Sequence, residues 1–133
     1  MNKFIVDAYN FAGWLGCLDQ VKQGEISLKE ARQKVFNIIL KNPLLLSMGN
    51  KIIVNLVFDS QMDTAKKIRR REVRGLKIIF SSTRETADDF IIRIAQKGDV
   101  VVTHDRELKQ KLELRGIQVK WPEFFFGDKP HMN

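Results

Sequence analysis

Short apolar runs alternate along the chain with stretches in which apolar residues recur every three or four positions. Short continuous runs predict strands buried in a sheet, whereas the longer recurrence predicts amphipathic helices. On this basis, strands are expected over residues 3–7, 51–59, 76–80, 99–103 and 117–120. Helices are expected over residues 11–22, 28–42, 83–97 and 106–115.

Local signals mark where two of these helices begin and where one ends. A capping box is a Ser or Thr followed three residues later by Glu, and its two side chains satisfy free backbone N–H groups at a helix start. The Asn42–Pro43 pair is expected to end or kink the second helix. Two pairs have the capping-box spacing, Ser27 with Glu30 and Ser82 with Glu85.

Strands separated by helices predict an α/β fold. Right-handed crossovers through the helices make the strands mostly parallel. Apolar runs without alternation suit strands that are covered on both faces. We therefore expect a mostly parallel five-stranded sheet flanked by helices, and, with no repeat or linker in the sequence, a single domain over residues 1–133.

Composition narrows the class of protein. With 44% hydrophobic and 29% charged residues in 133, the chain has the balance of a globular domain rather than of a disordered tail. No apolar run approaches the roughly 20 residues of a membrane span, and the N-terminus does not resemble a signal peptide. The single cysteine, Cys17, forms no intramolecular disulfide and belongs to no zinc motif. A cytoplasmic location is the simplest expectation.

Charge points to a polyanionic partner. Lysine and arginine number 23 against 16 acids, giving a net charge of +7, and small basic domains often bind nucleic acid. The charge is concentrated in residues 66–77, KKIRRREVRGLK, for which the alternative is a solvated helix face. We expect salt-dependent phosphate contacts that ignore base sequence. The candidates in this segment are Lys66, Lys67, Arg69, Arg70, Arg71 and Arg74.

Three predicted strands end in an aspartate or run just into one. They are followed by Asp7, Asp59 and Asp105. In an open parallel sheet, sites form beyond the carboxyl ends of the strands, so these acids are expected to meet there. Singly, each has a structural alternative: Asp105 as a helix N-cap and Asp59 as the start of a turn.

A fourth acid is expected from the helix over residues 83–97. Glu85, Asp88 and Asp89 share one face of its first turns, TRETADDFII. Glu85 is explained by its capping box, and Asp89 by the helix dipole. Asp88 is the favoured inward acid, with Asp89 as the alternate.

Clustered carboxylates repel one another, and a divalent cation relieves that repulsion. Hard oxygen ligands without Cys or His favour Mg²⁺ or Mn²⁺ over zinc. Such a site activates water and holds a phosphate oxygen during in-line displacement. A basic protein with an acidic, metal-binding pocket has the features that a nucleic-acid phosphodiesterase requires.

Four motifs in this order resemble a known family. Asp7-Ala-Tyr-Asn10 is similar to the D-G-Y-N signature of the NYN branch of PIN-like ribonucleases, and residues 84–91, RETADDFI, to the G-E-T-A-D-x-x-I segment of its bacterial YacP-like group. Residues 57–59, VFD, and 102–105, VTHD, resemble the family's V-F-D and V-T-S-D. Together the motifs span most of the chain.

The resemblance implies a PIN-like three-layer fold, divalent-metal dependence and endonucleolytic cleavage of RNA. The acids carried over are Asp7, Asp59, Asp88 and Asp105, with Asn10 orienting water or phosphate. Three positions depart from the family pattern. Ala8 and Arg84 replace glycines, and His104 replaces a small residue. Arg84 adds positive charge at the pocket edge, which bears on the substrate more than on the fold.

Two functions remain as alternatives: a metal-dependent endoribonuclease, and a noncatalytic RNA-binding module on the same fold. Single-stranded or loop RNA is the expected ligand, with Tyr9 as a candidate for stacking on an unpaired base. The intact acid set favours the nuclease. The sequence leaves open a ribosome or translated mRNA as partner, and a homodimer through the apolar residues 121–126.

Overall fold

The computed structural model describes residues 3–43, 45, 53–59, 69–82 and 84–123. Lys66, Lys67 and the aromatic residues 124–126 lie outside them. The strands are β1 (Lys3–Asp7), β2 (Ile53–Phe58), β3 (Arg69–Val73), β4 (Leu76–Phe80), β5 (Val100–Val102) and β6 (Gln118–Lys120). The helices are α1 (Ala8–Leu15), α2 (Cys17–Lys22), α3 (Leu28–Leu40), α5 (Ala87–Ile94) and α6 (Arg106–Leu114).

The strands form one sheet in the order β3-β4-β2-β1-β5-β6. Every neighbouring pair is parallel except β3 with β4, which is antiparallel. The expected α/β fold with a mostly parallel sheet is confirmed. The strand beyond the expected five is β3, which lies at the sheet edge.

The order of the strands creates a switch point beside β1. From β1 the chain builds β2 and β4 on one side, and then crosses through α5 to build β5 and β6 on the other. Ligand sites in open α/β sheets form beyond the carboxyl ends of the strands at such a point. Asp7, the last residue of β1, lies at that end.

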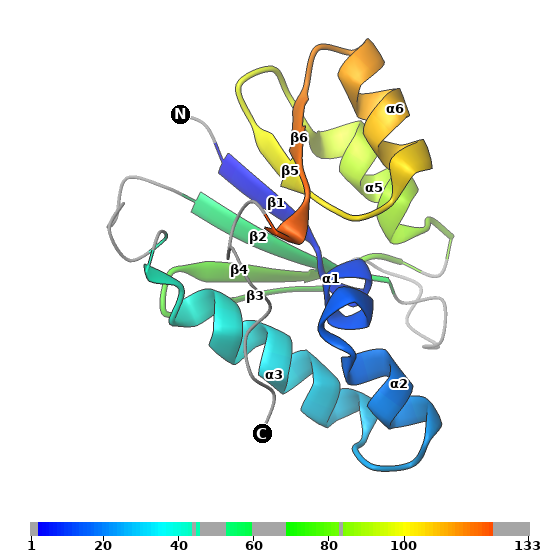
Figure 1. Cartoon of the computed structure of the whole chain (residues 1–133). Coiled ribbons are helices and arrows are strands. Elements are labelled where there is room, and N and C mark those ends of the chain that lie inside the picture. The colour runs from blue at the N-terminus through cyan, green and yellow to red at the C-terminus, as the bar shows by residue number, and fades with distance from the viewer. Residues whose placement is uncertain (1–2, 44, 46–52, 60–68, 83, 124–133) are drawn as a thin grey trace.

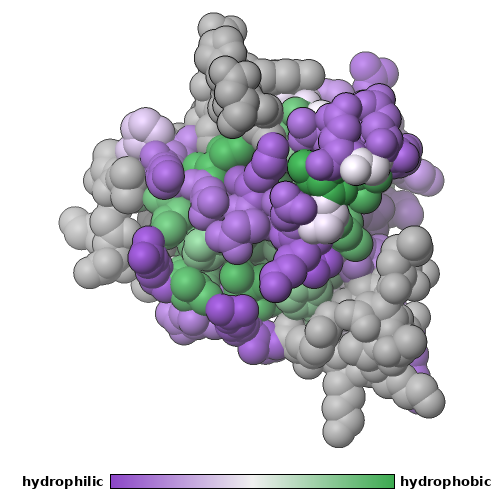
Figure 2. Space-filling view, turned by 90° about the horizontal axis from the view of Figure 1, so that it is seen from below, coloured by the Kyte–Doolittle hydropathy of each residue, from purple (hydrophilic) through white to green (hydrophobic). Residues whose placement is uncertain are grey.

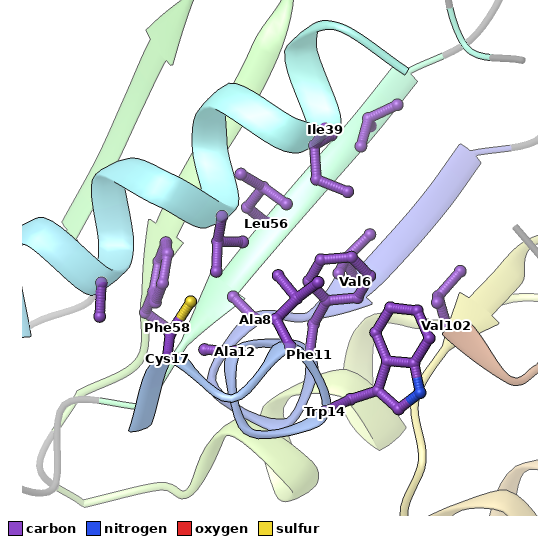
Figure 3. Packing of buried hydrophobic residues seen from close by; sticks show 14 of the residues in the cluster. Val6, Ala8, Phe11, Ala12, Trp14, Cys17, Ile39, Leu56, Phe58 and Val102 are labelled. Carbon is purple, nitrogen blue, oxygen red and sulfur yellow. The ribbon is translucent and has the colours of Figure 1, made fainter. Parts of the chain in front are cut away.

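Helices cover both faces of the sheet, giving three layers (Figure 1). Buried side chains of α1, α2 and α3 pack on one face against Val6, Leu56 and Phe58. Figure 3 shows this cluster from close by, with Phe11 and Trp14 reaching in from α1. On the other face, α5 and α6 pack against Ile5 and Val57. Successive strand residues thus serve opposite cores, which explains the uninterrupted apolar runs.

Two expected helices differ from the observed ones. The helix expected over residues 11–22 is split at Gly16, whose φ of 88° ends α1 in the left-handed region that suits glycine. The helix expected over residues 83–97 extends only over Ala87–Ile94. Its N-cap is Thr86, whose hydroxyl accepts from the Asp89 N–H, so the capping box expected from Ser82 with Glu85 was wrong.

The described part of the basic segment is not a helix face. Arg69–Val73 and Leu76–Phe80 form an antiparallel hairpin. Arg74 and Gly75 make the turn with φ of 50° and 84°, and positive φ at both central residues is the geometry of a tight hairpin turn. Alternating strand geometry therefore displays the arginines on both faces of an edge strand.

Among the described helices, none is both long and apolar enough to span a bilayer.

Candidate acidic active site

Four carboxylates lie together at the carboxyl end of the sheet. Asp7 ends β1, Asp59 follows β2, Asp88 lies in the first turn of α5, and Asp105 caps α6 after β5. Asp7 interacts electrostatically with each of the other three. The structure therefore brings together the four acids that the sequence singled out at the switch point.

Asp7 is the most buried of the four, with 6% of its surface exposed. Burial raises its pKa from 3.8 to about 7, and the negative charge of Asp88 adds to that rise. The Thr103 hydroxyl donates a hydrogen bond to Asp7 Oδ2 at 3.1 Å. This hydrogen bond lowers the pKa of Asp7 and so offsets part of the rise. Near neutral pH the carboxyl group is thus balanced between its protonated and ionised forms.

Asp88 is half-buried and faces the same cluster. Burial raises its pKa to about 6, followed by the charge of Asp105 and a hydrogen bond between the two carboxyl groups. Such a hydrogen bond requires one proton between two acids, because two ionised carboxylates only repel. The nearness of Asp105 is therefore one reason why the pKa of Asp88 is raised.

Asp89 takes no comparable position. Its side chain is exposed, and its backbone N–H donates to the Thr86 hydroxyl. Glu85, on the same expected face, instead pairs with Arg93 at 2.8 Å. The inward acid of α5 is thus Asp88, as favoured from the sequence.

Two of the acids also hold the backbone. The Asp105 Oδ1 accepts from the N–H groups of Glu107 and Leu108, at 2.9 and 3.1 Å, and so caps α6. Asp59 Oδ2 accepts from the N–H of Ala87, the first residue of α5, at 3.2 Å. The structural alternative for Asp105 as an N-cap is therefore correct, and it coexists with membership of the acidic cluster.

A short polar network fixes the loop after β5 against β1 and α1. Thr103 donates to Asp7 and its hydroxyl accepts from the Asp105 N–H at 3.2 Å. Asn10 Oδ1 accepts from the His104 N–H at 2.6 Å. Asn10 thus acts on the loop backbone, and its expected contact with water or phosphate stays a prediction. Thr103 was missed as a site residue, although it lies within the VTHD motif.

The cluster fits a hard divalent cation in its chemistry. Its donors are carboxylate oxygens, which Mg²⁺ and Mn²⁺ prefer, and the raised pKa values show how poorly these acids tolerate charge together. Within the described residues, no three His, Cys, Asp or Glu side chains stand in a group that could hold an ion. Mg²⁺ usually binds through one or two carboxylates and completes its shell with water and phosphate oxygens, so a pair such as Asp88 and Asp105 suits it.

The residues expected to bind nucleic acid are dispersed. Arg70, Arg71 and Arg74 are exposed on the β3–β4 hairpin, and Arg84 is exposed before α5. Tyr9 instead points toward α3, where its hydroxyl accepts from Arg32 Nη1 at 3.2 Å. Its ring meets the edge of Phe58, with the ring centres 5.0 Å apart.

Comparisons with known proteins agree with this architecture. The model of the YacP-like NYN domain family matches residues 4–125. A crystal structure of a mutant of Rae1 (YacP) from Bacillus subtilis is similar with a TM-score of 0.60 and 23% identity, over 91% of this chain and 70% of that chain. A search of the curated proteins found no match. The solved structure supports the fold, and the family match indicates a nuclease-type, RNA-related function, since NYN domains are generally nucleases.

Proposed function

This chain belongs to the YacP-like NYN domain family, as its motifs predicted, and we propose that it is a divalent-metal-dependent endoribonuclease. NYN and PIN-like nucleases usually require a divalent metal. The observation that carries the proposal is the convergence of Asp7, Asp59, Asp88 and Asp105 at the switch point of the sheet, with the pKa values of Asp7 and Asp88 raised. The reaction is hydrolysis of an RNA phosphodiester bond.

Each acid has a defined part in this proposal. When bound, Mg²⁺ or Mn²⁺ supplies activation of water and stabilisation of charge on phosphate oxygens. Asp88 and Asp105 would hold the ion, because their carboxyl groups lie close enough to hydrogen-bond with each other. The Thr103 hydroxyl fixes the orientation of the Asp7 carboxyl group by donating a hydrogen bond to it. Asp59 keeps the start of α5 near the cluster by accepting from the Ala87 N–H.

In this proposal, positively charged side chains on the protein surface attract the RNA. The net charge of +7 and the exposed arginines of the β3–β4 hairpin attract the phosphate backbone, while the acids lie at the sheet end. Arg70, Arg71 and Arg74 take this role, together with Lys66, Lys67, Arg69 and Arg84. A single-stranded region fits best, because its backbone can bend into the site. A cytoplasmic location completes the proposal.

Cleavage of an end-labelled single-stranded RNA tests the proposal. Wild-type protein should cut in Mn²⁺ or Mg²⁺ and not in EDTA. Asp88→Asn should lose at least about a hundredfold of the rate, because removal of one group that stabilises developing charge has that effect. Asp89→Asn is the matched control on the same turn and should stay within about threefold.

Three results would count against the proposal of a metal-dependent nuclease. Cutting that persists in EDTA, or equal losses in the two variants, contradicts an acidic metal site centred on Asp88. Salt-sensitive RNA binding without cutting in any metal would favour the noncatalytic RNA-binding module.

A further inference from the structure

A cavity of about 560 Å³ lies outside the acidic cluster, between α3 and the β3–β4 hairpin. Its volume is in the range of sites that hold small molecules or single nucleotides. The face on which α2 and α3 lie shows hydrophobic patches bordered by hydrophilic residues (Figure 2). The lining residues that matter here are Lys29, Arg32, Phe36, Arg70, Arg71 and Phe80.

Aromatic rings form one wall of this cavity. Phe58 and Phe80 are the last residues of β2 and β4, and their rings stack with centres 5.3 Å apart. The Arg32 guanidinium lies 5.8 Å from the centre of the Phe80 ring, and its hydrogen bond to the Tyr9 hydroxyl holds it there. A flat apolar surface beside a guanidinium plane is a surface on which nucleic-acid bases stack.

The cavity is strongly cationic. Lys29 and Arg32 come from α3, and Arg70 and Arg71 come from β3. No acidic residue is among its described lining residues, and none of the four cations forms a salt bridge with an acid in the described part of the chain. Positive charges without an acidic partner among the described residues, next to an aromatic wall, match a ligand that is both anionic and flat, as a nucleotide is.

The cavity lies on the α3 face of the sheet and reaches the carboxyl ends of β2 and β4, whereas Asp88 and Asp105 belong to elements on the other face. Phe58 directly precedes Asp59, and Phe80 pairs with Phe58 in the β2–β4 register. β4 and β1 lie on either side of β2, so Phe80 is two strand spacings, roughly 10 Å, from Asp7. An RNA strand bound at the acids therefore reaches the cavity by passing around the carboxyl end of the sheet.

We propose that this cavity binds one nucleotide of the RNA strand held at the acidic cluster. The base stacks on the Arg32 guanidinium, whose other side lies over the Phe80 ring, and the adjoining phosphates contact Lys29 and Arg71. The inference rests on the proposed function for the identity of the ligand, and adds to it a subsite for a base outside the cleaved linkage. An acidic peptide would satisfy the cations but would leave the aromatic wall unused.

Abasic RNAs test the subsite. The probe is a fluorescent single strand of about ten nucleotides, matched by a series in which one base at a time is removed while the backbone is kept. Binding is measured by anisotropy in EDTA, where metal-dependent cleavage is absent. Wild-type protein should lose about tenfold in affinity when one particular base is missing, because stacking of a base contributes that much.

Variants assign that loss to the cavity. Arg32→Gln should bind the intact strand more weakly and bind intact and abasic strands equally. Lys111→Gln, an exposed charge on α6 across the sheet, is the control and should keep the tenfold difference. Arg71→Gln is exposed on an edge strand, where folding tolerates it, and should weaken all strands equally, as loss of a phosphate contact does.

The subsite is rejected if wild-type protein binds all abasic strands with the same affinity as the intact strand. It is also rejected if the Arg32→Gln variant still binds one abasic strand more weakly than the intact strand. Displacement of the RNA by a poly-glutamate peptide of equal charge, at the same concentration as unlabelled RNA, would also overturn it. The outcome is separate from the nuclease proposal. If the protein cuts RNA with metal but binds every abasic strand with the same affinity, only the subsite is rejected. If affinity falls for one abasic strand but no RNA is cut, only the nuclease is rejected.

Discussion

At the scale of single residues, burial of Asp7 makes the metal-free protein sensitive to pH. Because the folded-state pKa is raised from 3.8 to about 7, the folded protein holds more protons than the unfolded chain between those values. The free energy of unfolding should therefore fall as pH rises through this window. Asp7→Asn, which is neutral throughout, should be more stable than wild type at pH 8, by up to about 4 kcal/mol. Urea unfolding in EDTA at pH 5 and pH 8 measures it, and equal pH dependence in the two proteins would contradict it.

Thr103 acts on the same carboxyl group through one hydrogen bond. Its hydroxyl lowers the pKa of Asp7, so Thr103→Val should raise that pKa by about one unit, the effect of a hydrogen bond to a charged group. The acid limb of the pH–rate profile for RNA cleavage should then move to higher pH. Thr103→Ser keeps the hydroxyl and should restore the profile. An unchanged limb in the valine variant would show that Thr103 serves packing alone.

At the scale of elements, the start of α5 shows how a local pattern can mislead. Two capping patterns overlap in SSTRETADD: Ser82 with Glu85, and Thr86 with Asp89. The second forms the cap, while Glu85 pairs with Arg93 on the next turns. Thr86→Ala should therefore lower the free energy of unfolding by about 1 kcal/mol, and Ser82→Ala by less than about half of that. Urea titration of the two variants decides it, and a larger loss for Ser82→Ala would reject Thr86 as the cap.

Other elements also differ in whether the sequence predicts them. The strands that precede the acidic cluster, β1 and β2, were predictable because short runs made almost entirely of apolar residues have few other structures available. The break at Gly16 was not, since the apolar spacing continues across it and only the backbone reverses. The β3 strand was also missed, because its run of arginines reads as a charged surface until it pairs with β4.

At the scale of the whole molecule, the acidic cluster was predictable and the cavity was not. Asp7, Asp59 and Asp105 follow from one rule, that parallel strands bring their carboxyl ends to one edge, and Asp88 follows from its position in the first turn of α5. The cavity depends on how α3 packs beside a hairpin about thirty residues later in the chain, and no local pattern in either segment indicates it. Arg32 reads in sequence as one more solvated charge on a helix.

Cation binding to the whole fold gives a test that is independent of cleavage. An ion that binds only the folded protein stabilises it by about 2.7 kcal/mol at a hundred times its dissociation constant. At pH 8, Mn²⁺ should therefore raise the melting temperature of wild-type protein by roughly 5–10 °C. At pH 5 the shift should shrink, because Asp7 and Asp88 are then largely protonated and protons compete with the ion.

Two variants on the same turn of α5 provide the control for this Mn²⁺ experiment. Asp88→Asn removes the acid that pairs with Asp105 and should abolish most of the Mn²⁺ shift, whereas Asp89→Asn on the exposed side of the same turn should keep it. Differential scanning fluorimetry of the three proteins with Mn²⁺ and with EDTA measures the difference. Equal shifts in both variants would mean that the ion binds elsewhere on the molecule, and the acidic cluster would then owe its raised pKa values to packing alone.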